Sequence, residues 1–565
     1  MRDLLEGLPE SGPTRPNQLF YGDNLTIMRK LPSACVDLLY LDPPFNSQRT
    51  YNLIYRKATG APVPEQEEAF CDAWELDEEK QEMVRSMPIV LRRHGVDHDL
   101  VRFWDAWISA LRNTQPRMLA YLVYMTFRLL EMRSLLKPTG SLYLHCDPTA
   151  SHYMKVILDG LFGHANFRNE VIWKRTFSHG SARRWGDVHD VLLFYTKSDR
   201  YTWNRVLQAH APGYVAEKYR QSDARGRYQL VVLTGPGTTN GPSGQPWRGY
   251  DPTTAGRHWV VPRAGLAELR ADGIDVPDEL HAQLDLLYEH GFIVFPRKRG
   301  GTGIPRFKLH LPEGQSAQDV ILDVPPINSQ AKERLGFPTQ KPIALLKRII
   351  QASSNEGDYV FDPFCGCGSA IYAAQELGRR WIGCDIAILS VQLVRDVLRK
   401  RYGLEEGRDY EMTGVPRSVE AARELFRHEP LQFQHWAVEL AGGFCSTRLS
   451  GDRGVDGRIY FETSSGLKHM VLSVKGGKLS PAIVRELAGT IGGQQGAMLG
   501  GLVCLNEPTR GMREAAGSAG MCDYLGIAYP RLQIRTIGDL LGKQAFSTPS
   551  RVQTLDWERQ IRLPF

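Results

Sequence analysis

The stretch LLYLDPPFN, residues 38–46, constrains the fold more than any other part of this sequence. Its apolar residues predict a strand, which has to end near Asp42 because Pro43 and Pro44 lack an amide hydrogen and favour extended turns. Open α/β sheets bind ligands beyond the carboxyl ends of their strands, which is where Asp42 and Phe45 would lie. A D-P-P sequence can also be a turn without function, so its meaning depends on the rest of the chain.

Length and composition limit the class of protein. The 565 residues exceed what one hydrophobic core usually supports, so about two to four domains are expected. A hydrophobic content of 42% excludes a largely disordered chain, and the net charge of +6 permits an acidic partner such as nucleic acid without requiring one. The nine cysteines are scattered and form no pair of CxxC clusters, so neither a disulfide framework nor a zinc site is predicted.

The sequence contains no recognisable targeting or membrane segment. Its first residues, MRDLLEGLPE, are acidic and lack the apolar stretch of a signal peptide. No uninterrupted apolar run reaches the roughly 18 residues that a membrane-spanning helix needs. We therefore expect a cytoplasmic protein that does not enter a membrane.

Residues 356–386 read as a strand, a glycine-rich loop, a helix and a second strand that ends at an acid. Gly366 and Gly368 let the backbone approach a ligand closely, and Asp385, about 20 residues further on, could bind ribose hydroxyls. The unit indicates an adenosine-containing cofactor. A cofactor-binding oxidoreductase is the alternative, but it leaves LDPPF and PTQKP unexplained.

Between residues 203 and 335 the composition changes to glycine, proline and arginine with interspersed aromatic residues. Contact with a nucleic acid needs cations for the backbone and aromatic rings for the bases, and this segment has both. The rings in question are Trp247, Tyr250, Trp259 and Phe307. They could equally form a small hydrophobic core.

Four motifs, taken in order, make roughly the first 400 residues resemble an amino-group DNA methyltransferase of the permuted type, in which the catalytic motif precedes the cofactor motif. The motifs are LDPPF at 41–45, GSLYLHCDP at 140–148, LGFPTQKP at 335–342 and FDPFCGCGS at 361–369. The resemblance implies a doubly wound, Rossmann-like α/β sheet with an inserted target-recognition region. It also implies methyl transfer from S-adenosylmethionine to double-stranded DNA. Aspartate rather than serine before Pro-Pro favours adenine N6 over cytosine N4.

The resemblance further implies roles for individual residues. Asp42 and the carbonyl of Pro43 would accept the two amine hydrogens, and Phe45 would stack on a base flipped out of the duplex. The expected catalytic residues are Asp42, Pro43, Pro44 and Phe45, and the expected cofactor-binding residues are Asp23, Thr339, Gln340, Lys341, Asp362, Phe364, Gly366, Gly368 and Asp385. Three of these have a plain structural alternative, because Thr339 could cap a helix, Phe364 could be core and Asp23 could hold a turn.

The C-terminal region resembles the Mrr-like branch of the PD-(D/E)xK nuclease fold, through GVDG at 454–457 and SVKGGK at 473–478. The resemblance implies a smaller α/β domain in which Asp456 binds Mg²⁺ and Lys475 stabilises charge or orients water near the scissile phosphate. Ser473 stands where the usual acid would be, so Glu486 on the following helix is the expected second metal ligand, and Glu439 could add to it. The alternative is a domain that no longer cuts and binds DNA or a partner.

Together these patterns predict a restriction-modification protein, an adenine-N6 methyltransferase fused to a Mg²⁺-dependent endonuclease. The expected segments are a catalytic half at 1–202, a target-recognition region at 203–335, a cofactor half at 336–405, a linker at 406–425 and a nuclease domain at 426–565. The alternative is a modification protein whose last domain is an inactive docking module and whose cleavage partner is another chain. A homodimer and a separate restriction or specificity subunit are both compatible with the sequence, and the recognition sequence cannot be read from it.

Overall fold

The structure is a computed structural model of the chain. It describes residues 16–44, 50–53, 67–71, 74–176, 183, 185–298, 301–302, 304–328, 331, 333–335, 337, 339–445, 455–463, 466–493 and 496–549. The chain forms two compact units, one made of Met1–Asn204 and Asp319–Phe565 and the other of Arg205–Gln318.

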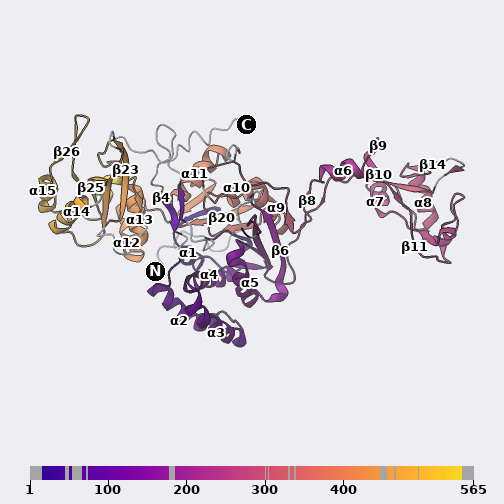
Figure 1. Cartoon of the computed structure of the whole chain (residues 1–565), viewed down its shortest axis with the longest axis horizontal. Helices are drawn as coiled ribbons and strands as arrows, with labels where there is room; N and C mark the ends of the chain where they lie inside the picture. The colour runs from indigo at the N-terminus through magenta and orange to yellow at the C-terminus, as the bar shows by residue number, and fades with distance from the viewer. Residues whose placement is uncertain are drawn as a thin grey trace. The chain divides into compact units, whose positions relative to one another are not determined.

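A nine-stranded sheet in the order β18-β6-β7-β5-β2-β19-β20-β1-β21 forms the centre of the first unit (Figure 1). The strands are β1 (Asn17–Tyr21), β2 (Val36–Leu41), β5 (Leu136–Cys146), β6 (Phe167–Lys174), β7 (His189–Thr196), β18 (Val320–Ile321), β19 (Tyr359–Asp362), β20 (Arg380–Asp385) and β21 (Tyr410–Thr413). The strands from β5 through β21 in this order pair in parallel, whereas β7 is antiparallel to both β5 and β6. The expected α/β sheet is confirmed.

Helices cover both faces of this sheet, and strand β2 shows why. Its side chains alternate between the faces, so that Leu38 and Tyr40 belong to one hydrophobic core while Leu39 and Leu41 belong to the other. The first core includes residues of α9 (Ile343–Ser353), α10 (Ser369–Glu376) and α11 (Ile388–Tyr402). The second includes residues of α1 (Asn24–Met28), α4 (Pro116–Leu135) and α5 (Pro148–Phe162).

Two further helices, α2 (Glu78–Arg93) and α3 (His98–Thr114), extend the second core. Each begins at an aspartate whose side chain accepts a hydrogen bond from the first helical turn, Asp77 in α2 and Asp97 in α3. Their buried residues recur at helical spacing and pack with those of α4. Ahead of them lies the antiparallel pair β3 (Thr50–Leu53) and β4 (Glu67–Cys71).

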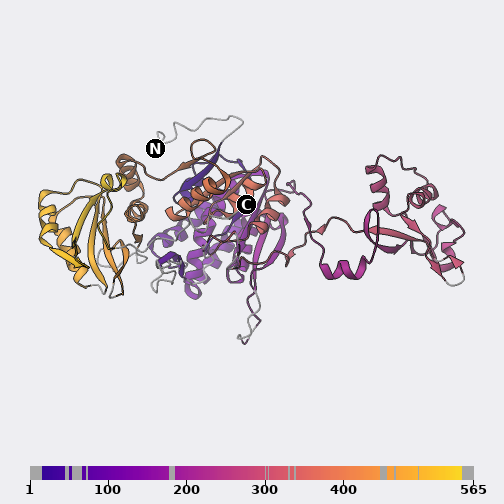
Figure 2. The same ribbon diagram turned by 90° about the horizontal axis from the view of Figure 1, so that it is seen from above.

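The C-terminal part of the first unit contains a five-stranded sheet in the order β22-β23-β24-β25-β28, with its strands side by side in Figure 2. The strands are β22 (Phe444–Cys445), β23 (Gly457–Thr463), β24 (Gly466–Lys475), β25 (Ala497–Cys504) and β28 (Leu532–Thr536), and β26 (Met521–Tyr524) with β27 (Ile527–Pro530) makes a separate hairpin. Helices α14 (Pro481–Gly493) and α15 (Arg510–Ser518) share a core with Val471 and Leu502 of the sheet. On the other face, Leu472 and Val503 belong to the first core described above. That core also includes residues of α12 (Val419–His428), α13 (Pro430–Leu440) and α16 (Ile537–Leu541).

The segment predicted as a linker, 406–425, has regular structure. It includes β21, which pairs with β1 at the edge of the nine-stranded sheet, and most of α12. Gly403, Gly407 and Gly414, which suggested a linker, have positive φ angles of 66°, 81° and 98° and form turns around this strand. The edge strand therefore follows the residues expected to end the cofactor half.

The second unit has its own hydrophobic core, which decides the role of three aromatic residues. Trp247, Trp259 and Phe307 are 4%, 2% and 2% exposed and pack with α7 (Arg263–Ala271) and α8 (Leu280–Glu289), so for these three rings the alternative of a small hydrophobic core holds. Tyr250 is half-buried and packs against Trp259. The elements are β8 (Leu207–Gln208), α6 (Pro212–Lys218), β9 (Gln221–Asp223), β10 (Gly226–Val232), β11 (Thr234–Pro236), β12 (Arg257–Trp259), α7 (Arg263–Ala271), α8 (Leu280–Glu289), β13 (Ile293–Val294), β14 (Arg297–Lys298), β15 (Gly301–Thr302), β16 (Arg306–His310) and β17 (Gln315–Ser316).

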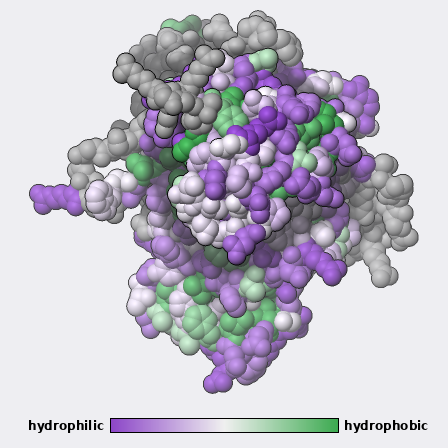
Figure 3. All heavy atoms as spheres, turned by 90° about the vertical axis from the view of Figure 1, so that its right-hand side faces the viewer, coloured by the Kyte–Doolittle hydropathy of each residue, from purple (hydrophilic) through white to green (hydrophobic). Residues whose placement is uncertain are grey.

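Within the described part of the chain, no helix is long and apolar enough to cross a membrane. Figure 3 shows one face of the molecule, on which hydrophilic residues predominate and hydrophobic ones gather in separate patches.

Candidate active site

Four acidic residues that lie far apart in the sequence follow neighbouring strands of the nine-stranded sheet. Asp42 follows β2, Asp362 ends β19, Asp385 ends β20, and Asp23 comes two residues after β1. These four strands are consecutive in the sheet and parallel, so their carboxyl ends meet at one edge. The structure thus brings together the acids that the sequence predicted for the site.

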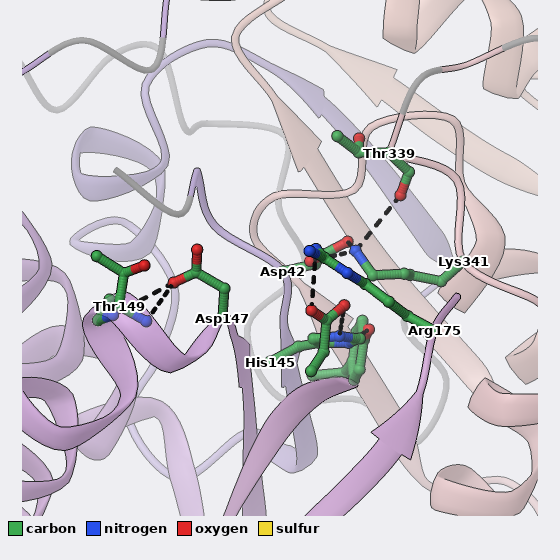
Figure 4. Close-up of polar contacts among 10 residues, drawn as sticks. Asp42, His145, Asp147, Thr149, Arg175, Thr339 and Lys341 are labelled. Atoms are coloured by element: carbon green, nitrogen blue, oxygen red, sulfur yellow. Dashed lines mark hydrogen bonds and ion pairs between the residues drawn. The ribbon is translucent and has the colours of Figure 1, made fainter. Parts of the chain in front are cut away.

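Asp42 is held by Lys341, whose ammonium donates to both carboxylate oxygens at 2.7 and 2.6 Å (Figure 4). The same ammonium lies 3.4 Å from the carbonyl oxygen of Thr339. Pro43 is buried and Pro44 half-buried beside Asp42, whereas Phe45 lies outside the described residues. The acid expected to accept the amine hydrogens is therefore already ion-paired with a residue expected to bind the cofactor.

A buried polar network lies next to this pair, and the sequence analysis missed it. His145 is fully buried, with Nδ1 at 2.9 Å from the Tyr40 hydroxyl and Nε2 at 3.1 Å from Asp190. Arg175 lies 3.1 Å from the other oxygen of Asp190. Burial raises the pKa of Asp190, but the hydrogen bond and charge of His145, with Lys341 and Arg175, bring it below its ordinary value. The only sequence signal was the place of His145 in GSLYLHCDP.

The loop after β19 is tied to Asp385. The backbone N–H of Gly366 donates to Oδ2 of Asp385 at 2.8 Å, and that of Ala387 donates to Oδ1 at 2.9 Å. Burial raises the pKa of Asp385, and these two hydrogen bonds oppose the rise. Gly368 has φ of +86°, and a Cβ atom there would come within 2.8 Å of both Tyr372 and Val394. Glycine is thus required at 368 by conformation and by space.

The geometry of Asp385 fits the ribose of an adenosine-containing cofactor. The backbone N–H groups of Gly366 and Ala387 each donate to one carboxylate oxygen, and hydrogen bonds from the Ser390 side chain and the Ile386 backbone also act on this carboxylate. Its place at the carboxyl end of β20 suits contact with a ribose hydroxyl.

Asp362 and Phe364 lie at the start of the same loop. Oδ1 of Asp362 accepts a hydrogen bond from the Phe364 N–H at 3.0 Å. Burial raises the pKa of Asp362 well above its ordinary value, and the charges of Asp42 and Asp385 add to the rise. The Phe364 side chain is half-buried and packs against the second core. Phe364 is therefore part of a hydrophobic core, as the alternative had it, while its contact with a cofactor stays a prediction.

Asp23 and Gln340 both make contacts that stabilise the chain around the site. Asp23 caps α1 by accepting from Thr26 N–H at 3.1 Å, and it forms an ion pair with Arg128. Gln340 accepts from the Leu335 N–H at 2.7 Å and donates to the carbonyl of Glu333 at 2.6 Å. Arg128 had no predicted role. For Thr339, the helix-capping alternative is not met, because α9 begins after Pro342.

A second group of polar residues lies around Asp456, between α13 and β24. Gln434 donates to one carboxylate oxygen at 2.6 Å, while the Val474 N–H and the Ser473 hydroxyl lie 2.5 and 3.3 Å from the other. The Lys475 ammonium is 3.9 Å from that second oxygen. Burial raises the pKa of Asp456, and these four neighbours oppose the rise. Gln434 was not predicted.

The residues around Asp456 do not make a magnesium site by themselves. Hydrogen-bond donors occupy its carboxylate, and Glu486 is an exposed residue of α14. Among the residues that the structure describes, no three His, Cys, Asp or Glu side chains are grouped so that they could hold a metal ion. Metal binding by Asp456 and Glu486 therefore stays a prediction.

Glu439, on α13, is a buried carboxyl next to the first site. Burial raises its pKa to about 8, and the charge of Asp385 adds to the rise. Its Oε2 atom has no hydrogen-bond partner within the described part of the chain. The charge that acts on Glu439 is therefore that of Asp385. The sequence had suggested a place for Glu439 beside Asp456 instead.

We expect Glu439→Gln to stabilise the protein by an amount that grows with pH. Because the folded-state pKa lies above the ordinary value of 4.5, the stability from protonated Glu439 is complete below that value and is lost as the pH rises through about 8. Between pH 4.5 and about 8, the difference in free energy of unfolding between the variant and the wild type should increase by about 1.4 kcal/mol per pH unit. Thermal unfolding at several pH values measures the gain. Glu507→Gln, at a side chain that is 80% exposed, is the control and should show no such slope; a difference that is constant with pH contradicts the prediction.

Comparison with known proteins identifies relatives of this sequence. The family described as DNA methylase matches residues 36–395. The type II methyltransferase M.EcaI of Enterobacter cloacae is 32% identical over 339 residues, which cover 59% of this chain and 70% of that protein. The Mod subunit of the type III restriction-modification enzyme StyLTI of Salmonella typhimurium is 24% identical over 396 residues, which cover 66% of this chain and 52% of the subunit.

Among solved structures, the chain is similar to a DNA modification methylase of Thermus thermophilus in complex with S-adenosyl-L-methionine. The similarity covers 71% of this chain and 99% of that protein, with 14% sequence identity and a TM-score of 0.31.

Proposed function

The chain belongs to the DNA methylase family, and we propose that it transfers a methyl group from S-adenosylmethionine to the N6 amine of adenine in double-stranded DNA. The observation that supports this most directly is the place of Asp42 beyond β2, beside β19, the strand that leads into the Gly366 and Gly368 loop. The proposed amine acceptor and the proposed cofactor loop therefore lie at neighbouring strand ends. Aspartate before Pro43 is the reason for preferring adenine N6 to cytosine N4.

The chemistry explains what the protein has to supply. An exocyclic amine is a poor nucleophile because its lone pair is conjugated into the ring, and S-adenosylmethionine brings a methyl group already activated on a sulfonium. Asp42 and the Pro43 carbonyl would accept the two amine hydrogens and so direct the nitrogen lone pair toward the methyl carbon. Phe45 would stack on the base, which leaves the duplex at a cost of about a few kcal/mol.

The proposed cofactor contacts come from three strand ends and two loops. Asp385, at the carboxyl end of β20, would bind the ribose hydroxyls. Asp362, Phe364, Gly366 and Gly368 are proposed for the methionine side of the cofactor, Thr339, Gln340 and Lys341 for its carboxylate end, and Asp23 for its adenine.

We propose that the chain acts in restriction-modification, as the name of the StyLTI Mod subunit states for that protein. The segment 203–335, most of which forms the unit Arg205–Gln318, is the proposed target-recognition region and lies in the sequence between the catalytic half at 1–202 and the cofactor half at 336–405. Its exposed Arg220, Arg225 and Arg227 suit contact with phosphates. A separate restriction subunit and a homodimer are the partners proposed.

Incubation of the purified chain with duplex DNA and cofactor labelled in the methyl group tests the first proposal. We expect label in DNA and, after hydrolysis to nucleosides, N6-methyladenine, because Asp42 precedes two prolines at the proposed amine site. Label in N4-methylcytosine would contradict the choice of base, and an absence of label in DNA of mixed sequence would contradict the proposed function itself. Sequencing of the methylated DNA would also give the recognition sequence.

A second candidate function, endonuclease activity of the C-terminal region at 426–565, rests on the pair of Asp456 and Lys475, 3.9 Å apart. The Lys475 ammonium could contact a phosphate oxygen, whereas Asp456 would need a bound Mg²⁺ to face the same phosphate. Glu486 is the second metal ligand proposed for Mg²⁺. The competing proposal for this region is a module that binds DNA or another subunit without cutting, and cleavage assays on Lys475 variants separate the two.

A further inference from the structure

Lys341 makes a contact that its predicted role leaves unexplained. It is 7% exposed, and it reaches Asp42, a residue 299 positions earlier, with hydrogen bonds to both carboxylate oxygens at 2.7 and 2.6 Å. The carbonyl of Thr339 lies 3.4 Å from the same ammonium (Figure 4). The contact joins the loop before α9 to the end of β2.

The surroundings of this ion pair hold it in place. Asp190, which is 1% exposed, carries a second ion pair with Arg175 and a hydrogen bond with His145. Lys341 is close enough to Asp190 to act on its pKa. Two carboxylates therefore face two cations, and the side chains of Lys341 and Asp42 are 8% and 15% exposed, whereas that of Arg175 is 34% exposed. Removal of one partner from such a group leaves an unbalanced buried charge, which is costly.

Asp362, on the neighbouring strand, is a buried acid at the same edge that forms no ion pair within the described residues. Burial raises its pKa well above the ordinary value and the charges of Asp42 and Asp385 add to the rise, although the charge of Lys341 acts against it. A protonated carboxyl offers a donor where the amine of a base needs an acceptor. An acid that has to accept an amine hydrogen therefore benefits from a balancing cation.

The ion pair does not use all of the hydrogen-bonding capacity of Asp42. Each oxygen of Asp42 receives one hydrogen bond from Lys341, and a carboxylate oxygen can accept two. The lone pair that remains on the oxygen facing the base can accept an amine hydrogen. The two contacts from one ammonium also restrict rotation of the carboxylate, which fixes the direction of that lone pair.

We propose that Lys341 is a positioning residue for methyl transfer, which balances the charge of Asp42 and orients its carboxylate toward the amine of the flipped base. This inference rests on the proposed function. It differs from the role predicted for Lys341 at the carboxylate of the cofactor, because it places the effect of the lysine on the rate of transfer and not on binding of S-adenosylmethionine.

Lys341→Met, which keeps a long side chain without charge, separates these two roles. We expect kcat for methyl transfer to fall about 100-fold, as a misdirected reacting group would cause, while KM for S-adenosylmethionine changes less than about threefold. Lys341→Arg keeps the charge and should lose less than Lys341→Met. Lys347→Met is the matched control, because Lys347 is bound to Glu376 on the surface of α9, and it should keep the wild-type kcat.

A double-mutant cycle supplies a second readout. In Asp42→Asn, further replacement of Lys341 by methionine should lower kcat by no more than about threefold, because the residue that it positions has lost its charge. A kcat near the wild-type value in Lys341→Met, a rise confined to KM for S-adenosylmethionine, or losses that simply multiply in the cycle would each overturn the inference while the proposed function stands. If Lys341→Met does not fold, Lys341→Gln, which also removes the charge, is tested in the same cycle against the same outcomes. A wild-type chain that fails to methylate DNA would refute the proposed function, and the inference would fall with it.

Discussion

Replacement of Asp42 by alanine should lower kcat for DNA methylation by about 1,000-fold or more, with the affinity for S-adenosylmethionine unchanged within about threefold. Asp42 provides the only proposed side-chain acceptor for the amine, and alanine removes both of its oxygens. The amine lone pair would then stay conjugated with the ring of the base. The cofactor loop, which is tied to Asp385 by the Gly366 N–H, does not depend on this side chain.

Single-turnover transfer of labelled methyl groups measures the rate, and equilibrium binding of the cofactor measures the affinity. Asp42→Asn is the informative second variant, since it keeps one oxygen in place, removes the charge and breaks the ion pair with Lys341. Asp99→Ala, at a side chain that is 88% exposed, should behave as the wild type. Methyl transfer by Asp42→Ala at a rate within about tenfold of the wild type would refute the mechanism.

The edge of the sheet that carries the site could be predicted from the sequence because strand ends leave a local signal. Proline after Asp42 and the Pro363 and glycine residues after Asp362 each stop a strand at an acid, whatever the rest of the chain does. Parallel pairing then brings such ends to one edge, as it does for β2, β19 and β20. This step needs no knowledge of side-chain contacts.

The contacts within the site could not be predicted in the same way. That Lys341 reaches Asp42 depends on the path of a loop 299 residues away, and no local pattern encodes that path. The network of His145 and Asp190 depends on the antiparallel register of β5 and β7, in which Cys146 pairs with Val191. A shift of one residue in that register would turn Asp190 to the other face of the sheet.

Composition was a poor guide where a segment forms its own core. Aromatic residues among arginines suggested base contacts in the second unit, yet Trp247 and Trp259 lie edge to face with their rings 5.6 Å apart inside it. Residues 78–114 are rich in charge, which hides a regular pattern, although Val84, Met87 and Leu91 follow helical spacing and are buried. In both segments the burial of particular side chains, and not the average composition, decides the structure.

Replacement of Lys475 by alanine should abolish DNA cleavage in the presence of Mg²⁺, with a fall of about 1,000-fold or more, and leave methylation intact. The wild type is expected to cut unmethylated duplex DNA that carries its recognition sequence. Lys475 ends β24 with its ammonium 3.9 Å from Asp456, so alanine would remove the positive charge beside the proposed phosphate position. The methyltransferase residues lie on a different sheet, which is why the two activities should separate.

Cleavage of labelled DNA with Mg²⁺ or Mn²⁺, measured beside methyl transfer by the same preparation, tests this expectation. Lys478→Ala removes an exposed lysine three residues away and should cut as the wild type does. Asp42→Ala should also still cut, since its defect lies at the other site. A wild-type chain that cuts no unmethylated DNA with either metal refutes the endonuclease proposal and favours the docking module. In that case Gln434, Ser473 and Lys475 around Asp456 are better understood as the hydrogen-bonding partners of a buried acid that stabilises the C-terminal sheet.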